Sequence, residues 1–524
     1  DLANVLKSGK MPAPSRIVQE DVVGPSLGHE AITQGLWSFL IAFIVVMLYM
    51  ILMYGLVPGL IVDVALLANV FFLVGILASF KAVLTLPGIA GIVLTMGMAV
   101  DANVLIYERI KEELAAGKTH KSAVSDGYKN ALSAIIDSNL TTLLTGVILF
   151  YFGTGPIKGF ATTLIIGIIT SFFTAVFITR VIYDKMVDNG SVSKLTFVTS
   201  FSKNLLQGVN VNWIKIRKFG YILSCAFVLI AIVSLSVRGL NQGVDFTGGR
   251  NYVVRFAEKV NTEEIQQMLA PGFTDASVSV ITIGDENQVR ISTNYKIADN
   301  SKTIDDEVED IIYKSLQSKL AKDGVSKEMF IKGYIIDNGK ANLSTDANVS
   351  SLGVQSSQKV GPAIADDIKN AAFMAVVFSL LVVFLYILVR FRNVSYSVGA
   401  LSSLVHDTIF ILGIYSLTYT IMPFSMEIDQ SFIAAILTVI GYSINDTVVV
   451  FDRVRELKTN FPKRNQKDVI NEAVNATLIR TFSTSFSTFA VLLVIFMLGG
   501  ETIRGFVFAL MVGVLVGTYS TLFI

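Results

Sequence analysis

The sequence predicts a polytopic α-helical membrane protein with two pseudo-symmetric groups of membrane spans and a soluble α+β domain. Hydrophobic residues make up 52% of the 524 residues and charged residues only 16%, whereas soluble domains carry about 25% charged residues. Eleven apolar runs are long enough, at about 20 residues each, to cross a bilayer as helices. The runs are residues 32–54, 59–79, 84–107, 133–152, 160–182, 219–237, 371–390, 396–419, 430–451, 480–498 and 505–524.

The apolar runs divide the chain into six segments. Five runs lie before a polar connector and six lie after it. We therefore expect one span, together with most of a first outside domain, to precede residue 1. The segments are 1–31, a polar and extended remnant of that first domain; 32–182, the first membrane half; 183–216, the connector; 217–238, the first span of the second half; 239–370, a second outside domain; and 371–524, the remaining spans.

The two groups of spans are related in sequence, which predicts a parallel internal repeat. Val23-Gly24-Pro25 aligns with Val360-Gly361-Pro362, and the match continues through the apolar run that follows each motif. Asp101 then aligns with Asn445, one residue before Asp446. Repeats of this kind place a substrate or ion path between the halves. We therefore expect Asp101 and Asp446 to point into the interface between them.

Basic residues gather in the loops on one side of the predicted spans, and this side is predicted to be cytoplasmic. The soluble segments 1–31 and 239–370 then lie outside. The basic residues in two equivalent loops are Arg109, Lys111, Lys118, Lys121 and Lys129 in the first half, and Arg453, Arg455, Lys458, Lys463, Arg464 and Lys467 in the second.

Residues 239–370 show a strand and helix order that is typical of a ferredoxin-like α+β unit. Asn261 with Glu264 three residues later marks a helix start of the capping-box type. Gly248-Gly249 is interpreted as a turn, because no Gly-Lys-Ser/Thr follows as in a phosphate-binding loop. The predicted strands are 251–256, 278–283, 288–293 and 329–336, and the second helix spans 304–320.

Asp101 and Asp446 each place a carboxylate in an apolar run. An ionisable group at membrane depth costs about 2.5 to more than 10 kcal/mol, so its default interpretation is ion or proton handling. The alternative is a carboxylate at a helix end, solvated at the membrane interface. Each run then ends in an acidic-basic pair, Glu108-Arg109 and Asp452-Arg453, which we expect to form a solvated and loosely paired helix extension.

Composition excludes several other classes of site. A net charge of +1 gives no indication of a nucleic-acid partner. Cys225 is the only cysteine, so a disulfide or multi-thiolate metal site within the chain is excluded, and the three histidines are scattered. No nucleotide-binding motif or catalytic constellation is present. We therefore expect no metal, no cofactor and no enzyme activity.

Several motifs together resemble one family of membrane proteins. The first half resembles SecD and the second resembles SecF, so the whole chain resembles the fused SecDF protein-export membrane proteins of the resistance-nodulation-division superfamily. The SecD-like motifs are Val23-Gly24-Pro25-Ser26-Leu27-Gly28, Val100-Asp101-Ala102-Asn103-Val104-Leu105-Ile106 and Asp137-Ser138-Asn139; the SecF-like motifs are Gly243-Val244-Asp245-Phe246-Thr247-Gly248-Gly249, Val360-Gly361-Pro362, His406-Asp407, Ile444-Asn445-Asp446-Thr447 and Arg480-Thr481.

The resemblance implies that Asp101, Asp446 and Arg480 take part in proton flow. Movement of Arg480 between the two carboxylates would switch each of them between proton uptake and release. The alternative for Arg480 is a cation that snorkels from a helix end. The aligned residue of the first half is Ala134, so the machinery is asymmetric.

Three further residues are candidates for a secondary proton pathway. Asp137 could act as a relay on the cytoplasmic side or as a helix N-cap. His406 and Asp407 could join the relay or form a hydrogen bond between helices. The Ser/Thr-rich stretch 481–488 could line a water wire or allow close helix packing.

The resemblance also implies a function. It indicates a proton-motive-force-driven auxiliary subunit of the Sec protein translocase that promotes late-stage export of polypeptide across the bacterial cytoplasmic (inner) membrane, with its soluble domains on the periplasmic side. The implied partners are the SecYEG translocon, YajC-type accessory proteins, unfolded preprotein and the lipid bilayer. The alternatives are a small-molecule exporter of the same superfamily and a passive scaffold. Proton and sodium coupling both remain open.

Overall fold

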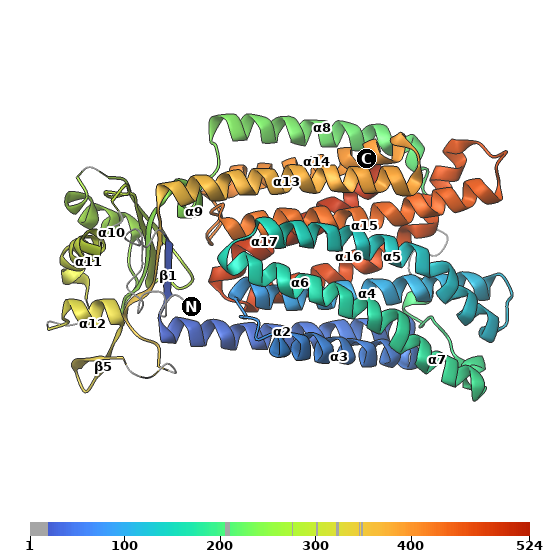
Figure 1. Ribbon diagram of the computed structural model, residues 1–524, viewed down its shortest axis with the longest axis horizontal. Helices are drawn as coiled ribbons and strands as arrows, with labels where there is room; N and C mark the ends of the chain where they lie inside the picture. The colour runs from blue at the N-terminus through green and yellow to red at the C-terminus, as the bar shows by residue number, and fades with distance from the viewer. Residues whose placement is uncertain are drawn as a thin grey trace, which may run out of the picture. The chain divides into compact units, whose positions relative to one another are not determined.

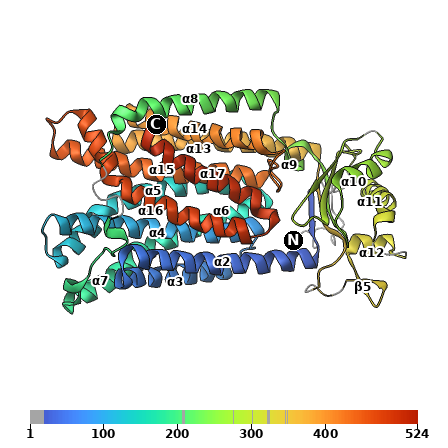
Figure 2. The ribbon, with the colours of Figure 1, turned by 180° about the vertical axis from the view of Figure 1, so that it is seen from behind.

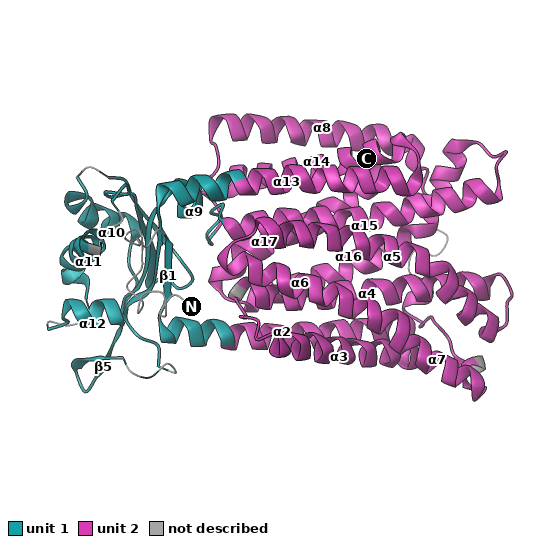
Figure 3. Cartoon of the chain, viewed as in Figure 1, with its two compact units in different colours: residues 1–32, 242–370, 423–429 teal, residues 33–241, 371–422, 430–524 magenta. Residues whose placement is uncertain are grey.

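The computed structural model describes residues 19–204, 210–274, 276–299, 302–320, 324–344, 346 and 349–524. The chain separates into two compact units, coloured teal and magenta in Figure 3. Unit 1 comprises residues 1–32, 242–370 and 423–429, and unit 2 comprises residues 33–241, 371–422 and 430–524.

Unit 2 is a bundle of long helices that run side by side (Figures 1 and 2). The described part of the chain contains 11 helices long and apolar enough to cross a membrane, as predicted. The first half contains α2 (Pro25–Tyr54), α3 (Leu56–Ser79), α4 (Leu86–Ala115), α5 (His120–Phe152) and the continuous α6 (Gly155–Phe173), η1 (Thr174–Ile178) and α7 (Thr179–Asp188); the second contains α8 (Trp213–Val237), α13 (Pro362–Phe391), α14 (Val394–Thr418), α15 (Gln430–Asn460), α16 (Gln466–Leu498) and α17 (Glu501–Phe523).

Most helices extend beyond the apolar runs that predicted them. The hydroxyl of Thr119 accepts a hydrogen bond from the Ser122 amide, so α5 begins well before its apolar run. At the N-terminus, the expectation of an extended segment through residue 31 is correct for the strand at residues 19–23 and wrong from Pro25, where α2 begins, and residues 1–18 lie outside the described residues. Proline suits the first turn of a helix, where its missing N–H would have no helical partner.

Equivalent helices confirm the internal repeat. Helices α2 and α13 both have 30 residues and both begin at the proline of a Val-Gly-Pro motif. Helices α5 and α16 both have 33 residues. The two halves therefore share helix lengths as well as sequence motifs.

Helices α4 and α15 form the centre of the bundle. Their most apolar windows are 89% buried, whereas those of α8 and α13 are 22% buried. Each central helix packs against a helix of the other half, α4 against α16 and α15 against α5. Gly97 of α4 approaches Thr488, and Gly441 of α15 approaches Thr142, at equivalent crossings. Small residues permit this close approach of two helix backbones.

Unit 1 is built on an antiparallel sheet with the strand order β1-β7-β2-β4-β3. Helices α10 (Thr262–Leu269) and α11 (Lys302–Leu316) pack against it through a shared apolar core. The side chain of Asn261 accepts hydrogen bonds from the Glu263 and Glu264 amides, which confirms the predicted helix start. The strands are β1 (Gln19–Val23), β2 (Gly249–Arg255), β3 (Val278–Thr282), β4 (Gln288–Thr293) and β7 (Gly353–Val360).

The ferredoxin-like strand order is confirmed, but the prediction of its fourth strand is wrong. The stretch 329–336 instead contains the end of α12 (Lys327–Lys332), which Ser326 caps through the Met329 amide. It continues into β5 (Tyr334–Asp337), which pairs with β6 (Lys340–Leu343) in a separate hairpin. The fourth strand is β7, between β1 and β2. Its polar sequence lacks the alternation that marks a half-buried strand.

The Gly248-Gly249 pair ends a short helix, α9 (Val244–Thr247), and leads into β2. Gly248 has φ of 70° and Gly249 has φ of 144°, which side chains rarely permit. A Cβ on Gly249 would also lie 2.8 Å from the Thr293 carbonyl oxygen. The interpretation of this pair as a turn is confirmed.

Candidate functional site

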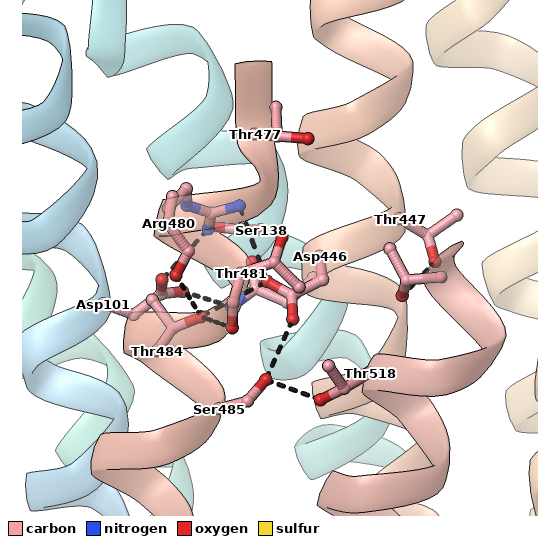
Figure 4. A network of polar contacts seen from close by, with 12 residues as sticks. Asp101, Ser138, Asp446, Thr447, Thr477, Arg480, Thr481, Thr484, Ser485 and Thr518 are labelled. Atoms are coloured by element: carbon pink, nitrogen blue, oxygen red, sulfur yellow. Dashed lines mark hydrogen bonds and ion pairs between the residues drawn. The ribbon is translucent and has the colours of Figure 1, made fainter. Parts of the chain in front are cut away.

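Asp101, Asp446 and Arg480 meet at the centre of unit 2, on α4, α15 and α16 respectively (Figure 4). Arg480 Nη2 lies 3.0 Å from Asp101 Oδ1, and Nη1 lies 3.5 Å from Asp446 Oδ1. The three residues are only 6%, 5% and 3% exposed. One guanidinium is therefore shared by two buried carboxylates, one from each half. This contradicts the interpretations of solvated carboxylates and of a snorkelling arginine.

The two carboxylates are held differently. Asn445 Nδ2 donates a hydrogen bond to Asp101 Oδ2, so Asp101 is bound by both Asn445 and Arg480. The hydroxyls of Thr484 and Ser485 approach Asp446 only to 3.5 Å, longer than a usual hydrogen bond. Asp101 is thus the tightly bound carboxylate and Asp446 the loosely bound one.

Arg480 has unused hydrogen-bonding capacity. Among the described residues, its buried Nε and Nη1 atoms have no hydrogen-bond partner. A guanidinium carries five N–H donors in a fixed plane. A small movement of the side chain or of α16 can therefore exchange partners without the loss of many existing bonds.

The charges of the cluster balance only when one carboxyl is protonated. Two carboxylates and one guanidinium leave one net negative charge, and an uncompensated buried charge is costly. Uptake of one proton makes the cluster neutral. The arrangement can therefore bind and release a proton, with Arg480 as the fixed positive charge.

Asp137 lies in a separate ion pair that also joins the halves. Arg390 Nε of α13 donates to both Asp137 oxygens at 2.7 and 2.8 Å, and the Tyr386 hydroxyl donates at 2.8 Å. The N-cap interpretation is wrong, because Asp137 lies inside α5 and Thr119 is the N-cap. Among the described residues, the Asp137 carboxylate pairs with Arg390 and Tyr386 and not with Asp101, Asp446 or Arg480.

His406 and Asp407 form a third polar centre, on α14. Asp407 Oδ2 accepts hydrogen bonds from Ser443 of α15 at 2.6 Å and from Ser520 of α17 at 2.9 Å. His406 Nδ1 lies 3.0 Å from Asp407 Oδ1. The interpretation as a hydrogen bond between helices is confirmed for Asp407. In the described part of the chain, neither side chain forms a hydrogen bond or ion pair with Arg480.

The Ser/Thr-rich stretch of α16 contributes to close helix packing, as one of the two interpretations predicted, while its role in a water wire stays a prediction. Thr488 packs at the close crossing with Gly97 of α4. Ser485 approaches Asp446 and accepts a hydrogen bond from the Thr518 hydroxyl at 2.6 Å (Figure 4). The stretch therefore packs against α4 at one point and surrounds a carboxylate at another.

The charged ends of α4 and α15 form a four-residue clamp of Arg109, Glu112, Arg453 and Glu456. Arg109 pairs with Glu112 at 2.8 Å and with Glu456 at 3.0 Å. Arg453 pairs with Glu456 at 3.0 Å and with Glu112 at 3.4 Å. The prediction of a solvated, loosely paired extension is wrong for these arginines, because each pairs across the two halves.

One intramembrane carboxylate was missed by the sequence analysis. Asp63 lies inside α3 and is 2% exposed. Neither of its carboxyl oxygens has a hydrogen-bond partner among the described residues. The signal was available, because Asp63 interrupts the apolar run 59–79 in the same way that Asp101 interrupts its own run.

Taken together, the fold and the buried cluster define a polytopic helical membrane protein whose two repeated halves share ionisable groups at their interface. The family model "Protein export membrane protein SecD/SecF, C-terminal" matches twice, at residues 5–189 and 340–524. The model "SecD/SecF GG Motif" matches residues 233–260. The chain belongs to the SecD/SecF family, and the double match agrees with the repeat.

Similar proteins include fused SecDF chains. The protein translocase subunit SecDF of Bacillus subtilis is 32% identical over 100% of this chain and 67% of its own length, and that of Brucella abortus is 32% identical over 100% and 63%. The crystal structure of Thermus thermophilus SecDF, described as a translocon-associated membrane protein, has a TM-score of 0.83 and 31% identity, and the match covers 99% of this chain and 65% of that one. The chain thus spans about two thirds of the length of these relatives.

Proposed function

We propose that this chain belongs to an auxiliary subunit of the Sec protein translocase that uses the proton motive force to promote late-stage export of polypeptide. The names of the SecDF relatives support the translocase role. The observation that carries the proton-driven part is the Arg480 guanidinium between Asp101 and Asp446, two buried carboxylates from different halves. A passive scaffold would have no need for this costly arrangement.

In this proposal Asp446 is the carboxyl that exchanges the proton. Its contacts are longer than those of Asp101, so its anion receives less stabilisation. Protonation of Asp446 leaves Arg480 paired with Asp101 alone, and deprotonation draws Arg480 back towards Asp446. Because α16 carries Arg480 and also packs against α4, this exchange of partners shifts the two halves relative to each other.

The electrical energy available is sufficient to bias such a movement. One elementary charge that crosses the membrane potential contributes about 2.3 kcal/mol per 100 mV. A shift of this size changes an equilibrium between two arrangements by more than tenfold. Each transferred proton can therefore favour one arrangement of the halves over the other.

The proposed membrane location, orientation and partners follow from the family and from the positions of basic residues in the loops. We place the protein in the bacterial inner membrane with unit 1 on the periplasmic side, since basic residues gather in the loops of the opposite side. The proposed partners are the SecYEG translocon, YajC-type accessory proteins and unfolded preprotein. We further propose a role as a transport component and not as an enzyme.

A precursor-export assay in sealed membrane vesicles tests this function. Vesicles with the full-length protein receive a partly translocated precursor, and its release is measured with a protonophore, with a sodium ionophore or with neither. We expect only the protonophore to abolish the stimulation. Vesicles with Asp446→Asn or Asp101→Asn should release as little precursor as vesicles treated with the protonophore. Both variants should still accumulate normally in the membrane. Sodium-dependent stimulation would contradict proton coupling, and full stimulation by both variants would support a scaffold.

A further inference from the structure

Asp63 differs from the other intramembrane carboxylates that the structure describes. Asp101 pairs with Arg480, Asp137 pairs with Arg390, and Asp407 accepts bonds from two serine hydroxyls. Asp63 is equally buried, at 2% exposure, but neither oxygen has a partner in the described part of the chain. An ionised carboxylate in this position would lack any compensating group.

The elements around Asp63 supply no compensating charge. Helix α3 packs against α4, α6, η1 and α7, and no cation or hydrogen-bond donor of the described residues contacts either carboxyl oxygen of Asp63. Most titratable groups of these elements have partners elsewhere, and Lys185 and Asp188 are exposed near the end of α7. The partnered groups are Asp101 with Arg480, Glu108 with Lys111, Arg109 with Glu112, Glu113 with Lys118, Arg180 with Asp184, Lys158 over the Phe150 ring, and Tyr183 with Tyr107, whose hydroxyl donates to the Pro58 carbonyl.

The immediate surroundings on α3 are apolar. The buried neighbours of Asp63 along the helix include Ile61, Val62, Ala65 and Leu66. A neutral carboxylic acid is tolerated in such a place at far lower cost than a carboxylate. Burial without a partner therefore favours the protonated form of the Asp63 carboxyl.

We propose that Asp63 is a second proton-binding site of unit 2, which holds a neutral carboxylic acid and is a target for hydrophobic carbodiimides. This inference does not rest on the proposed export function. Among the described residues, Asp63 forms no hydrogen bond with the Asp101–Arg480–Asp446 cluster. The site is also confined to the first half, because Leu401 stands at the aligned position of the second.

The chemistry of the modification requires the protonated form. The acid proton of Asp63 transfers to one nitrogen of dicyclohexylcarbodiimide, and the carboxyl oxygen bonds to the central carbon to give an O-acylisourea. The acyl carbon then bonds to the second nitrogen, and its bond to the bridging oxygen breaks, which yields a stable N-acylurea. All atoms of both reactants remain in the adduct. The apolar surroundings exclude the water that would otherwise hydrolyse the intermediate.

Asp137 provides the matched control. It is also buried, at 4% exposure, and lies in a membrane span, but Arg390 binds both of its oxygens. A guanidinium thus occupies both oxygens of Asp137, whereas the oxygens of Asp63 have no partner in the described part of the chain. The two aspartates therefore share burial and differ in whether a cation compensates the carboxylate.

The test treats the full chain in liposomes with dicyclohexylcarbodiimide from about pH 6 to about pH 9 and maps the adduct by peptide mass spectrometry. We expect Asp63 to carry at least about tenfold more adduct than Asp137 at neutral pH, because the Arg390 guanidinium occupies both oxygens of Asp137 and no described residue occupies those of Asp63. The adduct should decrease as pH rises. Asp63→Asn should abolish it, and Asp63→Glu should retain it.

Infrared spectroscopy provides a second measurement that needs no reagent to reach the site. The carboxylic-acid carbonyl band at neutral pH should lose one component in Asp63→Asn and none in Asp137→Asn. Loss of that component supports the proposal whether or not the adduct forms. An unchanged band together with an unmodified Asp63 would overturn it, because the carboxyl would then be ionised.

Discussion

Arg480 Nη2 lies 3.0 Å from Asp101 Oδ1, and this contact joins α16 of the second half to α4 of the first. The same guanidinium lies 3.5 Å from Asp446 through its other terminal nitrogen. Both carboxylates are thus within reach of one cation that can change its preferred partner.

The first prediction concerns the shape of that cation. Arg480→Lys keeps the positive charge but removes the planar fork that reaches two carboxylates at once. We expect this variant to insert normally and to lose most of the gradient-stimulated export. Arg480→Met should lose all of it. The measurement is precursor release from vesicles with matched protein content, and export by Arg480→Lys equal to that of the wild type would show that charge alone is sufficient.

The second prediction concerns the clamp at the ends of α4 and α15. A double-mutant cycle on Arg109→Ala and Glu456→Ala should give a coupling energy of about 0.5 to 1.5 kcal/mol. The value is modest because the Glu456 side chain is 40% exposed and therefore screened by solvent. Thermal unfolding in detergent provides the measurement. The exposed pair Lys296 and Glu307 in unit 1 is the control, with an expected coupling near zero.

The third prediction concerns the pair of Asp137 and Arg390. Asp137→Asn removes the negative charge of the carboxylate, both of whose oxygens accept hydrogen bonds from Arg390. We expect a loss of about 1 to 3 kcal/mol, less than for a fully buried pair because the Arg390 side chain is 27% exposed. Tyr386→Phe removes a single hydrogen bond to the same carboxylate and should cost about 1 kcal/mol. A larger loss in Tyr386→Phe than in Asp137→Asn, measured by thermal unfolding, would contradict this account.

The fourth prediction concerns pH and unit 1. Burial raises the pKa of Glu309 on α11 above its ordinary value of 4.5. The folded state therefore binds this proton more tightly than the unfolded state, and stability falls as pH rises from about 4.5 through the folded-state pKa. The protection factors of the α11 amides in the full chain, which are corrected for the intrinsic pH dependence of hydrogen exchange, should fall over that range. Glu309→Gln should remove the part of this pH dependence that comes from Glu309. A pH profile identical to that of the wild type would show that Glu309 is not its source.

The sequence predicted the elements whose side chains follow a regular pattern. Apolar runs identified all 11 candidate spans in the described chain, and the aligned positions of Asp101 and Asn445 predicted that the carboxylates face the interface between the halves. Both signals are visible in a single sequence, because an apolar run is a local pattern and the aligned positions recur in the two halves.

The features that the sequence analysis missed depend on neighbours that are distant along the chain. Strand β7 is polar, and only its position between β1 and β2 makes it a central strand. Arg109 and Glu456 look like solvated helix ends until α4 and α15 come together. Asp63 carried a visible signal, but its lack of partners is evident only in three dimensions.

The most direct test of the central claim is the proton conductance of proteoliposomes that contain the full-length protein and an unfolded polypeptide. Asp446→Asn keeps the shape and hydrogen-bonding capacity of the side chain but cannot exchange a proton. We predict that it abolishes the polypeptide-dependent conductance while the variant remains inserted in the same amount. A conductance equal to that of the wild type would show that Asp446 carries no protons and would contradict the account.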